Sequence, residues 1–202
     1  MPLTQSFWLD EYQRMVKVFA PFALRALLAG GRSGLNRLPP GSPANWDEFG
    51  DSAAQFANEW VLGVLASVSA TTQRQVVLAV SEWERQGRPD AWLEARLQVI
   101  LSDDRAAMIA VTEITRLHAQ GALMMWEVSG IVQAKIWRTA QDERVCPQCG
   151  PFEGQVVEFN AFGDFVVPFI GATIATPPAH PNCRCWLDAV LIPVPRRTPD
   201  LP

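Results

Sequence analysis

Two short cysteine-bearing stretches decide the organisation of this chain: CPQC at residues 146–149, and HPNCRC at residues 180–185. They contain all four cysteines of the 202 residues. A C-x-x-C turn lets two thiolates grip one tetrahedral ion, and two cysteines spaced two apart on a strand point to the same side. The pattern therefore predicts a metal site with five candidate ligands for four positions: Cys146, Cys149, His180, Cys183 and Cys185.

Zinc is the ion that suits such soft ligands. Either all four thiolates bind it and His180 lies outside the shell, or His180 replaces one thiolate. A site with four protein ligands is closed, so it would be structural and would clip a proline-rich region that has few strong secondary-structure signals. The alternative interpretation is ordinary buried thiols or disulfides, and the lack of an export signal in the sequence disfavours disulfides.

Upstream of this region the chain reads as helices. Apolar residues at helical spacing predict helices over 10–28 (kinked or divided at Pro21), 51–68, 76–86 and 92–101. Asp51 is the expected cap of the second of these, and Asp103 or Asp104 should cap a fifth helix that runs towards Gly121. A glycine- and proline-rich loop is expected over 30–45. Short strands are expected near 131–137, 156–159, 165–169 and 185–190.

The predicted fold class is therefore α+β, a helical N-terminal part followed by a small, loop-rich module that contains β-strands and is clipped by a metal. We expect a helical region over residues 1–104, the module over 105–192, and a proline-rich tail over 193–202. His118 should lie at a partly buried boundary of the fifth helix, and Glu113 could pair with Arg116 three residues later.

Composition restricts the function. Apolar residues make up 49% and charged residues 19%, so a real core is possible. The net charge of −4 argues against a non-specific nucleic-acid binder and against direct binding to DNA. The apolar runs are interrupted by charges and prolines, so we expect no membrane span and a soluble product. Sequence signatures of the common enzyme classes are missing, including the H-x-E that a zinc deaminase needs.

Longer motifs surround the cysteines and carry a resemblance. Residues 137–149 read WRTAQDERVCPQC, Gly154 follows, and residues 177–185 read PPAHPNCRC. Together with TEITR at residues 112–116, they resemble the C-terminal signature of the phage Mu protein F-like head morphogenesis (minor capsid) proteins. The resemblance covers roughly residues 105–191. It carries over the five candidate metal ligands, with Trp137, Thr139 and Asp142 as motif residues of unassigned role.

The resemblance implies a non-enzymatic virion component of a tailed phage, prophage or gene-transfer particle. Such a protein would be present in few copies near the portal inside the head, with the portal or the major capsid protein as its partner. It would occupy the host cytoplasm during assembly and then the virion. The oligomeric state stays open at this point.

Two rival functions use the same residues differently. The first is a zinc-dependent hydrolase or nuclease-like effector carried with the particle. It would need an open coordination position and a general base, for which Asp142, Glu143 or Asp164 would have to serve. The second is a cytosolic zinc-ribbon adaptor unrelated to phage.

Overall fold

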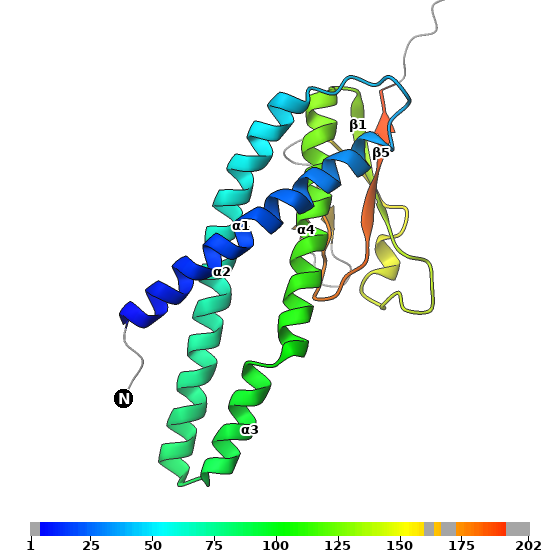
Figure 1. Ribbon diagram of the computed structural model, residues 1–202. Helices are drawn as coiled ribbons and strands as arrows, with labels where there is room; N and C mark the ends of the chain where they lie inside the picture. The colour runs from blue at the N-terminus through cyan, green and yellow to red at the C-terminus, as the bar shows by residue number, and fades with distance from the viewer. Residues whose placement is uncertain (1–4, 160–163, 167–172, 193–202) are drawn as a thin grey trace, which may run out of the picture.

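The computed structural model describes residues 5–159, 164–166 and 173–192. Four helices and a small β-module follow one another along the chain (Figure 1). The helices are α1 (Gln5–Leu35), α2 (Trp46–Gln86), α3 (Asp90–Ile100) and α4 (Asp103–Ser129). The strands are β1 (Val132–Arg138), β2 (Val156–Glu158), β3 (Phe165–Val166), β4 (Thr173–Ile174) and β5 (Trp186–Leu191), and a 3-10 turn covers Gly150–Phe152. The predicted α+β class, helices first and then a small sheet, is confirmed.

Helices α1 and α4 cross at very close range because small residues line both sides of the crossing. A Cβ atom on Gly121 of α4 would overlap the Leu27 carbonyl oxygen of α1, and one on Gly30 would overlap the His118 carbonyl oxygen. A Cβ on Gly34 would come within 2.8 Å of the Ala122 Cα. The Trp126 indole N–H donates a 2.9 Å hydrogen bond to the Gly34 carbonyl, which ties the two helices together at the top of the crossing.

This crossing explains why the predicted boundaries of both helices were wrong. The expected loop over 30–45 begins only after Leu35, because the glycines at 30, 31 and 34 are needed inside α1 for its contact with α4 and α2. For the same reason Gly121 does not end α4, which continues to Ser129 and is capped by the left-handed Gly130. Tertiary contact here outweighs the low helix propensity of glycine.

Helix α2 is one helix of 41 residues where the apolar stripes had predicted two. The link between the stripes stays helical: the Thr71 and Thr72 hydroxyls bond to carbonyls one turn back, at Ser67 and Val68. The N-cap is Asn45, whose side chain accepts the Glu48 N–H at 3.2 Å, and the expected cap Asp51 lies inside the helix. Gly87 ends the helix in the left-handed conformation, at the predicted place.

The second half of α2 and helix α3 form a hairpin that extends away from the β-module (Figure 1). Helix α3 starts at Asp90, close to the predicted 92–101. Helix α4 then starts at Asp103, but its N-cap is Ser102, which accepts the Arg105 N–H, and not Asp103 or Asp104. Among the described residues, none of the helices combines the length and the apolar run that crossing a bilayer requires.

Strand β1 is the centre of an antiparallel sheet with the order β2-β1-β5. Its pairing with β5 runs from Val132 opposite Leu191 to Arg138 opposite Trp186. One core lies between this sheet, the Trp126 face of α4 and the loops that carry the cysteines. A second core joins α1, α2 and α4 around Leu27, Phe49 and Met125. Strands β3 and β4 make a separate two-stranded ribbon, and the predicted strand residues 167–169 lie outside the described residues.

Candidate metal centre

The sheet register brings the two cysteine stretches together. Because β1 and β5 are antiparallel and Arg138 pairs with Trp186, the chain that leaves β1 and the chain that enters β5 meet at the same end of the sheet. CPQC follows β1 through a polar turn at residues 141–144, and HPNCRC immediately precedes β5. All four cysteines are free thiols, so the disulfide interpretation is wrong for this structure.

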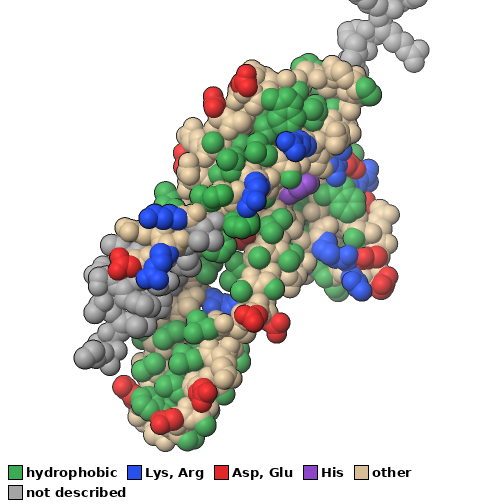
Figure 2. Space-filling model, in the orientation of Figure 1, with side chains coloured by type: hydrophobic (Ala, Val, Ile, Leu, Met, Phe, Trp, Pro, Cys, Tyr) green, Lys and Arg blue, Asp and Glu red, His purple; other side chains and the backbone are tan. Residues whose placement is uncertain are grey.

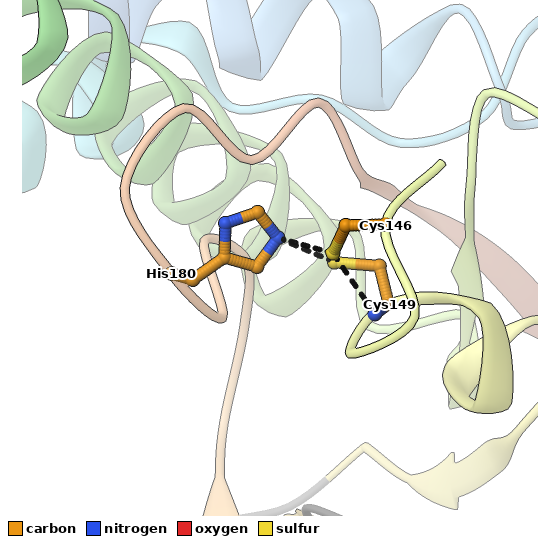
Figure 3. A group of neighbouring side chains, drawn as sticks. All are labelled: Cys146, Cys149 and His180. Carbon is orange, nitrogen blue, oxygen red and sulfur yellow. Dashed lines mark hydrogen bonds between the residues drawn. The ribbon is translucent and has the colours of Figure 1, made fainter. Parts of the chain in front are cut away.

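Cys146, Cys149 and His180 form the first group of donor atoms (Figure 3). The His180 Nε2 atom lies 3.0 Å from the Cys146 Sγ and 3.0 Å from the Cys149 Sγ. On the other side of the ring, Nδ1 lies 2.6 Å from the Pro181 carbonyl, which can only accept, so Nδ1 carries the hydrogen. In the neutral ring, Nε2 then presents its lone pair to the two sulfurs, the tautomer that a metal ligand requires.

Cys149, Cys183 and Cys185 form a second group, and all three are buried. The Sγ atoms of Cys149 and Cys183 lie 3.7 Å apart. Hydrogen bonds from Cys149 and then Cys185 lower the pKa of the Cys183 thiol to about 2. Hydrogen bonds to these same two neighbours, together with burial, raise the pKa of Cys149. Three crowded sulfurs thus favour one thiolate supported by two thiols.

The donor types, four thiols and one imidazole, are those that a tetrahedral zinc site uses. Zinc–sulfur bonds of about 2.3 Å place two thiolates of a tetrahedral site about 3.8 Å apart, and the 3.7 Å between Cys149 and Cys183 matches that edge. Cys149 belongs to both groups, so it is the donor common to the two sets. The five predicted residues are thus brought together in a cluster that could hold a metal, with five donors for four positions.

Helix α4 holds the HPNCRC loop in place through two threonines. The Thr112 hydroxyl accepts the Asn182 N–H at 3.0 Å, and the Thr115 hydroxyl donates to the Cys183 carbonyl at 3.2 Å. Asn182 itself has a φ of 60°, a left-handed conformation that asparagine tolerates better than most residues. Sequence reasoning gave these threonines no role, although their spacing of three within TEITR, on one helix face, was a signal that could have found them.

The three motif residues without a role turn out to support the cluster. Trp137 is fully buried, with its ring stacked on Phe152 at 4.6 Å. The Thr139 N–H and hydroxyl donate to Glu153 at 2.6 and 2.8 Å. Burial opposes ionisation of Glu153, but these hydrogen bonds outweigh it and lower its pKa. Sequence reasoning did not single out Glu153. Its place directly before the motif residue Gly154 was a signal that could have found it, and the φ of 77° explains why a glycine stands there.

At the surface, an ion pair between Asp142 and Arg184 links the two cysteine loops. The Asp142 carboxylate accepts two hydrogen bonds from Arg184, at 2.7 and 2.9 Å, and one from the Arg144 N–H at 3.0 Å. The Arg184 bonds come first among the causes that lower the pKa of Asp142. A carboxylate held in this way is a positioned ion-pair partner of Arg184, not a free base.

The other residues that the sequence analysis singled out lie outside the Cys/His cluster. Glu143 is exposed in the polar turn, and Asp164 lies near the buried ammonium of Lys135. The hollow against the cluster has a volume of about 30 Å³, an order of magnitude below the cavities that hold small-molecule substrates. His118 is half-buried on α4, and Arg116 bonds to Glu113 at 3.0 Å, so both of those expectations are confirmed.

Comparison with known proteins adds one finding. The model of the family described as phage Mu protein F like protein matches residues 71–188, more than half of the 202 residues. The match begins inside α2, upstream of the stretch whose motifs carried the resemblance. No curated protein and no solved structure gives a significant match. The matched residues include helices α3 and α4, strands β1 and β2, the start of β5 and all five candidate ligands, and the chain belongs to the phage Mu protein F-like family.

Proposed function

We propose that this chain is a non-enzymatic minor head protein of a tailed phage, a prophage or a gene-transfer particle. The single observation that carries the proposal is the family match over residues 71–188, because this family indicates a part in phage head morphogenesis. The small hollow at the cluster and the ion-paired Asp142 support a structural use of the site.

We place the protein inside the head, near the portal, with the portal or the major capsid protein as its partner. The α2–α3 hairpin supports this assignment, since it exposes large apolar side chains, two of which, Leu78 and Val99, line one hollow between α2 and α3. Val77, Leu78 and Val99 are exposed by 61%, 60% and 66%. Exposed apolar side chains gathered on one element are typical of a surface that another protein covers.

Quantitative mass spectrometry of purified particles tests this role. We expect the chain in mature heads at a low copy number, well below that of the major capsid protein. A strain in which Val77 and Val99 are changed to Asp should incorporate less of it, while Arg74→Glu, on the same helix, serves as the matched control. Normal, infectious particles that lack the chain, from a strain with the gene deleted, would contradict the proposal.

The second part of the proposal is that the cluster binds one structural zinc ion. Four donors from Cys146, Cys149, His180, Cys183 and Cys185 would hold it, and the bound ion would supply a rigid link between the two loops. Protein purified under reducing conditions should contain about one equivalent of zinc. X-ray absorption at the zinc edge should separate a shell of four sulfurs from one of three sulfurs and a nitrogen, because Zn–N bonds are about 0.2 Å shorter than Zn–S bonds.

Single replacements identify which donor stays outside the shell. If His180 is the spare donor, His180→Ala should keep the full zinc content, and Cys185→Ala should keep it if Cys185 is spare. Cys149→Ser should lose zinc in either case because Cys149 belongs to both groups. A folded wild-type protein that contains no metal would overturn this part without touching the role in the head.

A further inference from the structure

Helix α1 presents a basic face to the outside of the molecule. Between residues 12 and 46 the chain has five cations and no Asp or Glu, in a protein whose net charge is −4. Lys17, Arg25 and Arg32 are exposed on α1, and Figure 2 shows Lys and Arg side chains along the course of this helix. Phe22 lies among them, 58% exposed, with the Arg25 guanidinium 4.4 Å above its ring.

Helix α3 carries a groove of the opposite character. Its floor is apolar, formed by Leu93, Leu97 and Leu101, and Leu101 is 64% exposed. Its charged lining residues are Asp90, Glu94 and Asp103, all exposed, and none of the residues that line it is basic. The groove is shallow and open to solvent, with a volume of about 680 Å³. In Figure 2, acidic side chains gather at this end of the molecule.

The two surfaces are complementary in chemistry. An apolar ring flanked by cations on α1 matches an apolar floor flanked by carboxylates at α3 and at the start of α4. Helix-in-groove contacts of this kind place the apolar anchor in the centre and the charge pairs at the rim.

One molecule cannot make this contact with itself. Helix α1 packs on α4 and α2 through its inner face, where the side chains of Ala23 and Leu27 are buried. Its basic face therefore points away from its own α3. We propose that the basic face of α1 binds the acidic groove of α3 in a second copy of this chain. The contact joins two different surfaces, so it can close into a ring or continue from copy to copy.

Light scattering on the purified full-length chain tests the proposal. At about 50 mM salt, where charges act over more than 10 Å, the weight-average mass should rise with protein concentration to at least twice the 22.4 kDa of the monomer. At about 1 M salt, where the screening length is near 3 Å, the mass should fall towards that of the monomer.

Charge reversal then assigns the two surfaces. The double variant Lys17→Glu/Arg25→Glu should be monomeric, and so should Glu94→Lys/Gln98→Lys in the groove. Mixing the two variants should restore association, because each basic surface then finds an acidic one on the other variant. Arg74→Glu, an exposed charge reversal on α2 outside both surfaces, is the control and should associate like the wild type. Circular dichroism checks that every variant keeps its helices.

Three outcomes would overturn the proposal. The first is a wild-type chain that stays monomeric at low salt, and the second is association that survives either charge reversal. The third is a monomer whose basic face instead binds labelled duplex DNA, with anisotropy that the Lys17→Glu/Arg25→Glu variant loses. In that case the basic face of α1 would bind the phosphates of DNA and not a second copy of the chain.

Discussion

The α1–α4 crossing and the cysteine loops hold the molecule together by opposite means. At the crossing, Gly34 and Gly121 allow two regular helices to touch backbone to backbone, and hardly any polar chemistry is involved. The loops between β1 and β5 have little regular structure, and donor atoms of the five Cys and His side chains, with the Asp142–Arg184 pair, link them. The difference teaches that the first region depends on the size of side chains and the second on their chemistry.

Removing the thiol of Cys149, which belongs to both donor groups, should destabilise the protein most. Cys149→Ser takes one donor from both groups, so we expect the β-module to lose its fixed structure, together with the zinc ion proposed above. Hydrogen exchange should then speed up at the β1 and β5 amides, while amides in the first half of α2 stay protected. Gln148→Ser, in the same turn but exposed, should change nothing. Unchanged protection of β1 in the Cys149 variant would mean that the loops hold without their donors.

Adding a single methyl group at the crossing should have the next largest effect. Gly121→Ala places a Cβ against the Leu27 carbonyl, and backbone cannot move aside as a flexible side chain can. We expect a loss of about 3 kcal/mol in the free energy of unfolding, measured by urea denaturation. Gly63→Ala on α2 meets no atom within 4 Å and should instead gain about 0.5–1 kcal/mol. Similar midpoints for both variants would refute the close crossing.

Replacing Glu153 tests how much its hydrogen bonds stabilise the loop region, without changing a cysteine. Replacing it by Gln weakens the hydrogen bonds from Arg138 and Thr139, and we expect a loss of about 2 kcal/mol at neutral pH. Because the pKa of Glu153 is lowered in the folded state, this contribution is present above the unfolded value of about 4.3 and disappears as the pH falls through the folded value.

Urea denaturation of the wild type and of Glu153→Gln from pH 7 downwards measures this dependence. The stability difference between the two proteins should shrink as the solution becomes acidic. Glu143→Gln, which changes an exposed carboxylate in the turn after β1, is the control. A difference that stayed constant down to pH 2 would show that Glu153 acts through packing and not through its charge.

The Asp142–Arg184 pair should have the smallest effect. Both side chains are exposed, and exposed ion pairs contribute little to stability even with two hydrogen bonds. Asp142→Asn should lower the melting temperature by less than any change above, and the difference should vanish at high salt. A loss of stability as large as that of Glu153→Gln would mean that the Asp142–Arg184 pair orders the cysteine loops.

Sequence patterns identified the donors of the cluster but not the frame that holds them. CPQC and HPNCRC stand out because cysteine is rare in this chain and its spacing has a chemical meaning. Thr112, Thr115 and Glu153 belong to the frame, yet each is an ordinary polar residue until the fold brings its partner close. Which donor stays outside a tetrahedral shell depends on positions finer than any spacing in the sequence.

The helices illustrate a second limit. Apolar periodicity located α2, α3 and α4, and β-branched residues located β1, because these signals are local. The ends of α1 and α4 could not be predicted, since the glycines at 30, 34 and 121 act as breakers in isolation and as contact points only when the other helix is present. The domain limits at 104 and 192 remain predictions, and the tail over 193–202 lies outside the described residues.

The glycine crossing also has a consequence for synthesis in the cell. Gly34 meets Ala122, 88 positions later in the chain, and a ribosome adding 5–20 residues per second needs roughly 4 to 18 s to make that distance. During this interval the part of α1 that packs on α4 has no final partner, whereas α2 can already pack on α1 and form its hairpin with α3. The nascent chain thus has a defined window in which a chaperone or a neighbouring nascent chain can engage α1 first.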